Sequence, residues 1–371
     1  MSAGTGLGHA IEVRRDDITL TREVAVPAYE LVSGEVRLRV DCFALTANNM
    51  TYAALGEAMG YWRFFPASED GWGRVPAFGF AEVDASACEG VLTGARIYGY
   101  LPMATHLVVT PQRVSADGFT DGAAHRSELP GFYNSYLNVI ADPGYDAERE
   151  AEQMLLRPQF ATAFLIDDAL ADAGFHGASA VLLSSASSKT AYATAFLLAE
   201  RGAVEVIGLT SASNASFVRA LGCYDRVVTY DEVAELDPSR HVAYVDMSGD
   251  GALRARLHHH LGDALHLDLI VGATHHSSLG GEPDLPGVTP TMFFAPGRGK
   301  QREAEWGAGV LQAKVGAAWG RFVGFVTRDE GPAVLSVVRS SGPAAIQVAW
   351  SALASGRARP GEGQILAPRA D

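Results

Sequence analysis

The segment from Ala180 to Tyr230 constrains the fold of this chain more than any other. It opens with an apolar run, 180–183, that is typical of a buried strand, and a turn of small residues then leads into a helix over 191–201. A second apolar run at 204–209 and, after another short helix, a third at 226–230 complete the pattern. Strand, tight turn, helix and strand form a βαβ unit. Its right-handed crossover places the turn at the carboxyl edge of a parallel sheet.

That turn is suited to the pyrophosphate of a dinucleotide, because the amides and the dipole at a helix N-terminus favour an anion. The usual glycine fingerprint of such turns is missing, and Ser185, Ser188 and Ala191 occupy the matching positions. Serine is small and adds a hydroxyl donor, and Lys189 can pair with a phosphate. The alternative is a βαβ unit that packs and binds nothing. The residues predicted to hold the pyrophosphate are Ser185, Ser187, Ser188, Lys189 and Thr190.

Composition limits the partners of the chain. Its 371 residues suffice for one large or two ordinary domains, and 48% hydrophobic with 19% charged residues is globular. The net charge of −14 argues against nucleic acid and anionic membranes, which require a basic face, so a small-molecule partner is expected. The three cysteines are scattered, as is usual in a reducing compartment. The sequence has no apolar run of about 18 residues and no signal pattern at the N-terminus. We therefore expect a soluble cytoplasmic protein.

The regions on either side of the βαβ segment differ in pattern. Before it, many short strand-like runs over 36–110 predict a β-rich region, and a helix is expected from Arg157 to about Ala173. After it, two further apolar strands flank a helix over 252–261 whose last residues, His258 to His260, are expected to form a solvated helix end. A basic loop is expected at Arg298, Lys300 and Arg302. This loop either binds an anionic substrate or is simply exposed to solvent. Helices are predicted over 306–319, 332–338 and 343–354.

With these pieces in order, the chain resembles the medium-chain dehydrogenase/reductase superfamily, most of all its zinc-free branch of quinone and enoyl reductases. The resemblance implies an α/β fold, with a Rossmann-type doubly wound parallel sheet plus a β-rich GroES-like catalytic domain. The expected domains are 1–156, with an insertion at about 131–156, then 157–300, and finally C-terminal helices over 301–371 that return to the first domain. The segments that carry the resemblance are 47–56, 160–163, 181–191 and 217–227.

The chain departs from the zinc-dependent members of that superfamily. Alcohol dehydrogenases bind catalytic zinc through a cysteine and a Gly-His-Glu motif. The matching positions here lie near Ala47 and at 79–82, where there is neither a thiol nor a histidine. The four-cysteine structural lobe is also missing from the sequence. We therefore expect no metal site and a zinc-independent mechanism.

Without zinc, the resemblance implies hydride transfer from a reduced nicotinamide to an activated alkene, a quinone or a related carbonyl compound. Related enoyl reductases use a tyrosine from the loop that matches 47–56 as a proton donor, which makes Tyr52 the first candidate. Asn49 and Tyr133 complete the predicted catalytic set, and the predicted substrate-binding residues are Asn48, Tyr61, Trp62, Asn134 and Tyr136. The alternative for each aromatic residue is ordinary packing, and for the asparagines it is capping of a loop or helix.

The end of the second strand bears on the choice of cofactor. NAD-specific sites place an acidic residue there, and the run from Thr210 to Asn214 contains none, which favours NADP(H) over NAD(H). The further residues predicted to contact the cofactor are Thr162, Thr210, Ser211, Asn214, Gly272 and Phe294. A homodimer is plausible from the resemblance. The alternative function is a non-redox relative that acts as a binding or scaffold protein, or as a lyase or isomerase.

Overall fold

The computed structural model describes residues 8–142, 144–271, 285–307, 309–328 and 333–370. The chain forms two compact units, one made of Met1–Leu155 and Val337–Asp371 and the other of Leu156–Ser336. We call them the β-rich unit and the parallel-sheet unit. Among the described residues, no helix is long and apolar enough to cross a membrane.

The β-rich unit contains a nine-stranded and a three-stranded sheet. In the larger sheet the strands follow the order β17, β18, β3, β5, β6, β10, β9 and β8, and β7 pairs with β3 off this path. Their bounds are Ser336–Ser341, Glu362–Ala367, Val36–Leu45, Pro76–Ser86, Arg96–Pro102, Ser135–Asn138, Gly118–Asp121, Pro111–Ser115 and His106–Val109. The smaller sheet consists of β2 (Thr21–Val26), β1 (Gly8–Arg14) and β4 (Trp72–Gly73).

Alternation along β3 explains why this segment forms a strand. Val36, Leu38 and Val40 are buried on one face. Arg37 and Arg39, between them, point the other way and form ion pairs of 2.7 Å with Asp84 and Glu82 on the neighbouring β5. Cross-strand charge pairs of this kind fix the register of two strands.

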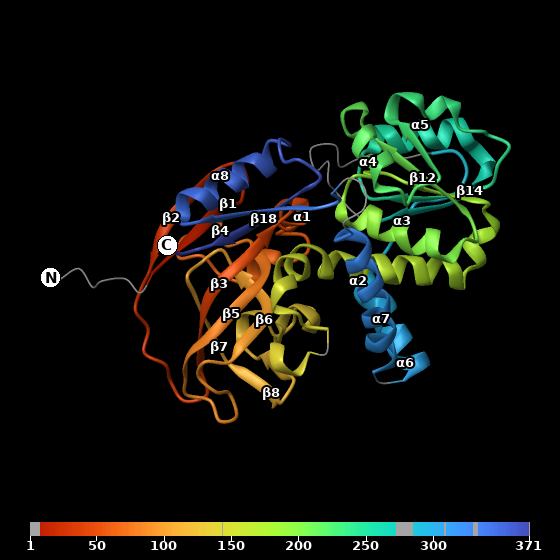
Figure 1. Ribbon diagram of the computed structural model, residues 1–371. Helices are drawn as coiled ribbons and strands as arrows, with labels where there is room; N and C mark the ends of the chain where they lie inside the picture. Colours follow the sequence, from red (N-terminus) through yellow and green to blue (C-terminus); the bar gives the residue numbers. More distant parts are fainter. Residues whose placement is uncertain (1–7, 143, 272–284, 308, 329–332, 371) are drawn as a thin grey trace. The chain divides into compact units, whose positions relative to one another are not determined.

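Helix α8 (Pro343–Ala354) anchors the C-terminal part of the β-rich unit. It lies beside β1 and β2 (Figure 1). The fully buried Trp350 donates its indole N–H to the Ile18 carbonyl at 2.7 Å, which satisfies its polar edge inside the core.

The parallel-sheet unit has six parallel strands in the order β13, β12, β11, β14, β15 and β16. Their bounds are Arg226–Thr229, Glu205–Thr210, Ala180–Leu183, Val242–Asp246, Leu265–Ile270 and Thr291–Met292. The chain runs outwards from β11 to β13 and then crosses back to β14, so the strand order reverses between β11 and β14. This is the doubly wound arrangement expected from the sequence.

Helices cover both faces of this sheet. Helix α5 (Gly251–Leu261) packs Leu253 and Leu257 against Leu182, Leu209 and Tyr244 on one face. Helix α3 (Lys189–Arg201) lies on the other face (Figure 1). The remaining short helix of the crossovers is α4 (Ala215–Leu221).

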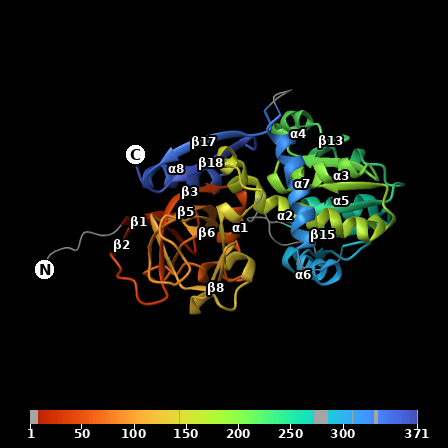
Figure 2. The same ribbon diagram turned by 60° about the horizontal axis from the view of Figure 1, so that its bottom comes forward.

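Two long helices, α2 (Glu150–Asp172) and α7 (Val310–Val326), pack together beside α3 in the parallel-sheet unit. Helix α7 crosses α2 in both views (Figure 1, Figure 2). The buried Phe322 of α7 lies 5.0 Å from the Phe160 ring of α2 and 5.4 Å from the Phe196 ring of α3. These ring contacts hold α7 on the parallel-sheet unit.

Several elements differ from those expected from the sequence. The helix predicted over 306–319 is two helices, α6 (Ala295–Trp306) and α7, because Gly307 and Gly309 take positive φ angles of 94° and 79° between them. Both helices belong to the parallel-sheet unit, so the expected return to the first domain begins only at Val337.

Four further expectations need correction. The residues predicted as a helix over 332–338 lead into strand β17, where Val337 and Val338 suit a pleated sheet. The basic loop around Arg298 is part of helix α6. Helix α2 begins at Glu150, earlier than Arg157. Part of the expected insertion, 135–138, forms β10 inside the large sheet.

Candidate active site

The turn after β11 is built on a buried polar connection between adjacent strand ends. Ser184 donates its hydroxyl to Oδ1 of Asp246 at 2.8 Å. The backbone amides of Met247 and Ser248 in turn donate to Ser184 Oγ at 2.9 and 3.1 Å. These bonds join the carboxyl ends of β11 and β14 at the point where the strand order reverses. Crevices at such points are where doubly wound sheets bind ligands.

The serines of the turn have local structural roles as well. Ser185 has a φ of 46°, a left-handed angle that glycine usually supplies, and its amide donates to the Tyr230 hydroxyl at 3.1 Å. Ser188 caps α3 by accepting from the amide of Ala191 at 3.3 Å. Asn214 donates to Ser187 Oγ at 3.2 Å, which ties the loop after β12 to the turn.

Lys189 supplies a cation at the first position of α3. Burial lowers its pKa from the ordinary lysine range to about 8. At neutral pH the ammonium form still predominates, and it lies at the helix end whose dipole also favours anions. Thr190 follows it and is half-buried.

The end of β12 completes this region. Thr210 is buried, Ser211 shares a 2.9 Å hydroxyl–hydroxyl hydrogen bond with Ser213, and no carboxylate lies in the run 210–214. Tyr224 donates its hydroxyl to the Ala186 carbonyl of the turn at 2.8 Å. A Cβ atom on Gly208 would lie 2.9 Å from both the Ala186 Cβ and the Tyr224 ring, so glycine at this position permits the close packing.

A buried charge network lies at the ends of β14 and β15. Arg254 on α5 forms ion pairs with Asp246 and, at 3.2 Å through Nε, with Asp268. His258 lies 2.9 Å from Asp268 and donates Nδ1–H to the Pro286 carbonyl. His258 is fully buried, so the expectation of a solvated histidine run is wrong at this position: residues 254 and 258 share one helix face, which points at the sheet.

In the β-rich unit, four tyrosines gather into what we call the tyrosine cluster: Tyr52, Tyr61, Tyr100 and Tyr133. Tyr52 comes from α1 (Ala47–Ala54), Tyr61 from a 3-10 helix at Tyr61–Arg63, Tyr100 from β6 and Tyr133 from a 3-10 helix at Gly131–Asn134. The Tyr52 ring centroid lies 4.6, 5.6 and 6.3 Å from those of Tyr61, Tyr100 and Tyr133. Phe64 packs against Tyr100 at 5.2 Å and against Tyr133 at 5.6 Å.

Asn48 and Tyr52 form the most specific polar contact of the cluster. They lie four residues apart on α1, and Asn48 donates its side-chain amide to the Tyr52 hydroxyl at 2.6 Å. Burial raises the pKa of Tyr52 above that of an ordinary phenol, although the neighbouring Tyr100, Tyr133 and Asn48 partly offset this. Tyr52 is therefore protonated throughout the neutral range and able to donate.

Other predicted residues serve the fold instead. Asn49 is buried, accepts from the Thr46 amide at 2.7 Å and donates to the Pro76 carbonyl at 2.8 Å, so its polar atoms cap and anchor α1. Trp62 is buried so tightly that a Cβ on Gly56 or Gly73 would collide with its ring.

Two residues of the expected insertion are also structural. Asn134 is buried and donates to the Arg126 carbonyl at 2.9 Å. Tyr136 is fully buried, donates to the Tyr100 carbonyl at 2.8 Å and accepts from Arg126 at 3.2 Å. The burial and hydrogen bonds of Asn134 and Tyr136 favour a packing role, which was the alternative to substrate binding in the sequence analysis. Tyr100, which the sequence analysis missed, could have been noticed only through the apolar run 97–101 around it.

The remaining predicted cofactor residues lie at three places. Thr162 is half-buried on α2 and bonds back to the Pro158 carbonyl at 3.5 Å. Phe294 is 54% exposed and precedes α6. Gly272 lies outside the described residues.

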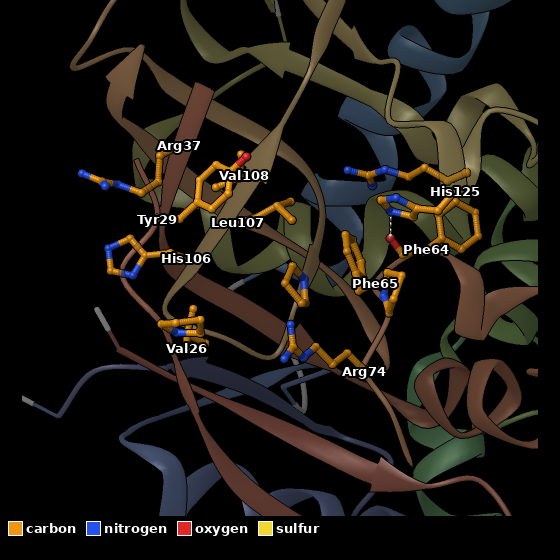
Figure 3. Close-up of a pocket in the computed structure, with 14 residues that line it drawn as sticks. Val26, Tyr29, Arg37, Phe64, Phe65, Arg74, His106, Leu107, Val108 and His125 are labelled. Atoms are coloured by element: carbon orange, nitrogen blue, oxygen red, sulfur yellow. Dashed lines mark hydrogen bonds between the residues drawn. The ribbon is translucent and has the colours of Figure 1, made fainter. Parts of the chain in front are cut away.

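A cavity of about 220 Å³ in the β-rich unit is not lined by any predicted site residue. Phe64 and Phe65 form one side of it, with Tyr29, Arg37 and His106 on the other (Figure 3). Its basic groups already have partners: Arg37 pairs with Asp84, and His106 Nε2 accepts from Arg369 at 2.8 Å. The tyrosine cluster, against which Phe64 of the cavity wall packs, is the better candidate for chemistry.

A larger and strongly charged cavity, about 560 Å³, lies in the parallel-sheet unit among α2, α6 and α7. Arg302 in its wall and the nearby Arg298 form ion pairs of 2.6 to 2.9 Å with Asp168 and Asp172. Because these arginines are matched by acidic partners, the alternative in which they grip an anionic substrate loses its main support.

Comparison with known proteins shows which family the chain belongs to. A family model described as "Protein of unknown function (DUF2855)" matches residues 43–359. The chain belongs to the DUF2855 family. A search of curated proteins finds no match to this DUF2855 chain.

Solved structures resemble the DUF2855 chain over nearly its full length. The yhdH oxidoreductase from Salmonella enterica in complex with NADP matches with a TM-score of 0.56 at 16% identity, covering 97% of this chain and 100% of that one. CurA in complex with NADPH from Vibrio vulnificus matches at 0.60 and 12%, covering 98% and 100%. The quinone oxidoreductase from Coxiella burnetii matches at 0.51 and 14%, covering 98% and 99%.

These structural similarities show the fold of the DUF2855 chain. The DUF2855 chain has the fold of these oxidoreductases, with a Rossmann-type doubly wound sheet and a β-rich GroES-like domain. The fold class inferred from the sequence is thereby confirmed. In the described part of the chain, no group of three or more His, Cys, Asp and Glu side chains has the arrangement of a metal site.

Proposed function

We propose that this DUF2855 chain is a zinc-independent, NADP(H)-dependent reductase that transfers hydride to an activated alkene, a quinone or a related carbonyl compound. The observation that carries the proposal is the turn after β11. It lies where the strand order reverses, offers Lys189 at a helix N-terminus, and faces a second strand end without a carboxylate. Solved neighbours of the same fold, in complex with NADP or NADPH, support the choice of cofactor.

The donor set of the turn fits a dinucleotide. Burial of the Lys189 ammonium disfavours its charge, which an anion would compensate. The Ser187 hydroxyl accepts from Asn214, so its own proton is available to a phosphate. We assign the pyrophosphate to Ser185, Ser187, Ser188, Lys189 and Thr190, the adenosine ribose to Thr210, Ser211 and Asn214, and the nicotinamide end to Thr162 and Phe294. When bound, the reduced nicotinamide supplies the hydride.

Tyr52 is the proposed proton donor. Asn48 occupies one lone pair of its oxygen, so the hydroxyl proton is directed elsewhere, towards a substrate oxygen that gains negative charge. A buried phenol with a raised pKa gives up its proton only to a strongly basic oxygen, such as the oxyanion of a developing enolate or hydroquinone. Asn48 thus orients Tyr52, and the half-buried Tyr61 and Tyr133 lie beside both.

The first test is a titration of the purified protein with NADPH and with NADH, followed by cofactor fluorescence. Saturable binding with NADPH favoured supports the proposal, and oxidation of NADPH by quinones, enones or enoyl thioesters would establish the reaction. Tyr52→Phe should lower kcat by about 10²-fold, the usual range for loss of a general acid, without changing the affinity for NADPH. Failure of both cofactors to bind at high concentration would refute the proposal.

One observation favours the second candidate, a relative without redox chemistry that binds a ligand or a partner. The Ser185 amide is already bonded to Tyr230 and the Ser188 hydroxyl already caps α3, so two groups of the turn are occupied within the protein itself. A protein that binds neither dinucleotide but is stabilised by a small molecule would fit this candidate.

We also propose a homodimer formed through β16. This two-residue strand is an edge of the described parallel sheet, and its Met292 is 72% exposed. An exposed edge strand with an apolar side chain is a template for pairing with a second copy across a twofold axis.

A further inference from the structure

The cavity of about 220 Å³ in the β-rich unit has a cationic wall without a carboxylate. The described residues that line it include no aspartate or glutamate but three arginines: Arg37, Arg74 and Arg126. Each arginine has an acidic partner, but these partners do not line the cavity: Asp84, Glu12 and Asp121. In the cavity among α2, α6 and α7, by contrast, three aspartates are part of the wall. A ligand in the cavity of the β-rich unit would therefore meet positive charge without an opposing carboxylate.

Arg126 is the most deeply buried of these cations. It is 1% exposed, and its two Nη groups donate to Asp121 and, at 3.2 Å, to the Tyr136 hydroxyl. Its Nε–H has no hydrogen-bond acceptor in the described part of the chain, and its guanidinium carbon lies 5.1 Å from the centre of the Phe65 ring. A buried donor without an acceptor costs stability, and a carboxylate bound beside Arg126 can supply the acceptor.

Arg74 also has donor capacity left over. Its Nε and one Nη share a single oxygen of Glu12, both at 3.2 Å, and its other Nη has no acceptor among the described residues. Glu12 is fully buried and also pairs with Arg22 at 2.8 Å, so one negative charge serves two guanidinium groups. Figure 3 shows the Arg74 side chain directed from the Phe65 side of the cavity towards Val26. A carboxylate in the cavity can accept from the free end of Arg74.

The rest of the wall suits an aromatic ring. Phe64 and Phe65 are buried on one side, Leu107 and Val108 lie on the other, and Tyr29, which is 46% exposed, marks the side open to solvent (Figure 3). An apolar cavity of about 150 Å³ holds a benzene ring. The volume of about 220 Å³ therefore suffices for one six-membered ring with a carboxyl group.

We propose that this cavity binds a monocyclic aromatic carboxylate, with its ring between Phe65 and Leu107 and its carboxylate at Arg74 and Arg126. The aromatic and aliphatic part of the wall selects the ring, and the arginines select the charge. Binding involves no covalent step and does not depend on the proposed reductase activity. The site is distinct from the tyrosine cluster, although Phe64 lines the cavity and packs against that cluster.

The test is isothermal titration calorimetry of the full-length protein, without a dinucleotide, using benzoate, benzamide and acetate. Benzamide keeps the ring of benzoate but lacks its charge, and acetate keeps the charge but lacks the ring. We expect one benzoate per chain, bound at least about tenfold more tightly than either analogue, because a carboxylate forms charge-assisted hydrogen bonds with guanidinium groups.

Three variants locate the site. Arg74→Gln keeps a donor for Glu12 and should weaken benzoate binding at least about tenfold without changing benzamide binding. Leu107→Trp fills the cavity and should abolish the binding of both. The matched control, Arg39→Gln, removes an arginine that is paired in the same sheet but does not line the cavity, and should change neither. Circular dichroism of each variant separates these results from misfolding.

Equal affinities for benzoate and benzamide, or wild-type benzoate affinity in Arg74→Gln, would overturn the assignment of the carboxylate. Undiminished binding by Leu107→Trp, or no binding of benzoate by the wild type at millimolar concentration, would overturn the site itself. A protein that binds benzoate but neither dinucleotide would refute the reductase and support this site, so the two failures are distinguishable.

Discussion

At the scale of single residues, Lys189 lies where its charge is disfavoured by burial and where a bound pyrophosphate would favour it. Its pKa of about 8 in the unliganded protein means that the cation is lost as pH rises through that value. Because the ammonium form is the one that binds an anion, NADPH affinity should fall by up to about tenfold per pH unit above 8. Dissociation constants measured by fluorescence between pH 6.5 and 9.5 test this.

Lys189→Met should weaken NADPH binding and remove this pH dependence. The exposed Lys300 on α6 offers a matched control, since Lys300→Met removes a cation from the same unit but not from the turn. A wild-type affinity that stays constant from pH 7 to pH 9 would contradict the role assigned to Lys189.

His106 governs a second pH effect, on stability. Burial, followed by the charge of Arg369, lowers its pKa to about 4, with further lowering by Arg37 and Arg39 and an opposing effect of Asp84. The imidazole in the unfolded chain, with a pKa of about 6.5, binds the proton more tightly than in the folded chain. The contribution of His106 is therefore complete above pH 6.5 and is lost as pH falls from about 6.5 to about 4.

Denaturant unfolding of the wild type and of His106→Gln at several pH values checks this effect. The free energy of unfolding should fall more steeply with acidity in the wild type than in the variant between pH 6.5 and 4. Parallel curves would show that the imidazole, which accepts from Arg369, does not titrate as proposed.

At the scale of secondary-structure elements, the packing of α7 against α2 and α3 depends on Phe322. This fully buried ring contacts Phe160 of α2 and Phe196 of α3. Phe322→Ala should cost about 3–5 kcal/mol of unfolding free energy, because it removes a large ring and leaves a cavity among three helices. Gln312→Ala, on an exposed position of the same helix, should change stability by less than about 0.5 kcal/mol. A small loss for Phe322→Ala would mean that α7 is held elsewhere.

The sequence was most informative about elements whose signal is local. Five strands of the parallel sheet, β11 to β15, are apolar runs bounded by turns, so their type could be predicted. Strand β17 could not, because its extended form depends on pairing with β18, more than 20 residues later. The break between α6 and α7 rests on positive φ angles at Gly307 and Gly309, and a helical hydrophobic pattern does not reveal such angles.

Local sequence signals also revealed only part of the candidate site. Tyr52, Tyr61 and Tyr133 were all named from the sequence, and the structure brings them together. Trp62, next to Tyr61 in the sequence, points into the fold, because adjacent residues on a helix face different directions. Asn49 is also buried, and its hydrogen bonds to the Thr46 amide and the Pro76 carbonyl anchor α1. Tyr100 enters the cluster from a strand of the sheet, and only tertiary structure could reveal this.

At the scale of the whole molecule, the proposed dimer makes a simple prediction. Met292→Lys places a charge on the exposed edge strand and should convert a dimer to a monomer, because pairing would bury an unpaired ammonium. Sedimentation velocity over a range of concentrations measures this. Val348→Lys, at a 71% exposed position on α8, is the control and should leave the oligomeric state unchanged. A wild-type protein that sediments as a monomer at every concentration would refute the dimer.

The β-rich unit is assembled from the two ends of the chain. Strand β3 receives one of its neighbours from β18, with Leu45 opposite Gln364, so this pairing spans more than 300 residues. During synthesis the ribosome must therefore complete the entire parallel-sheet unit before that side of β3 is covered. The nascent chain carries an open strand edge for most of its translation, and a message truncated just before residue 362 would release a protein with that edge permanently unpaired.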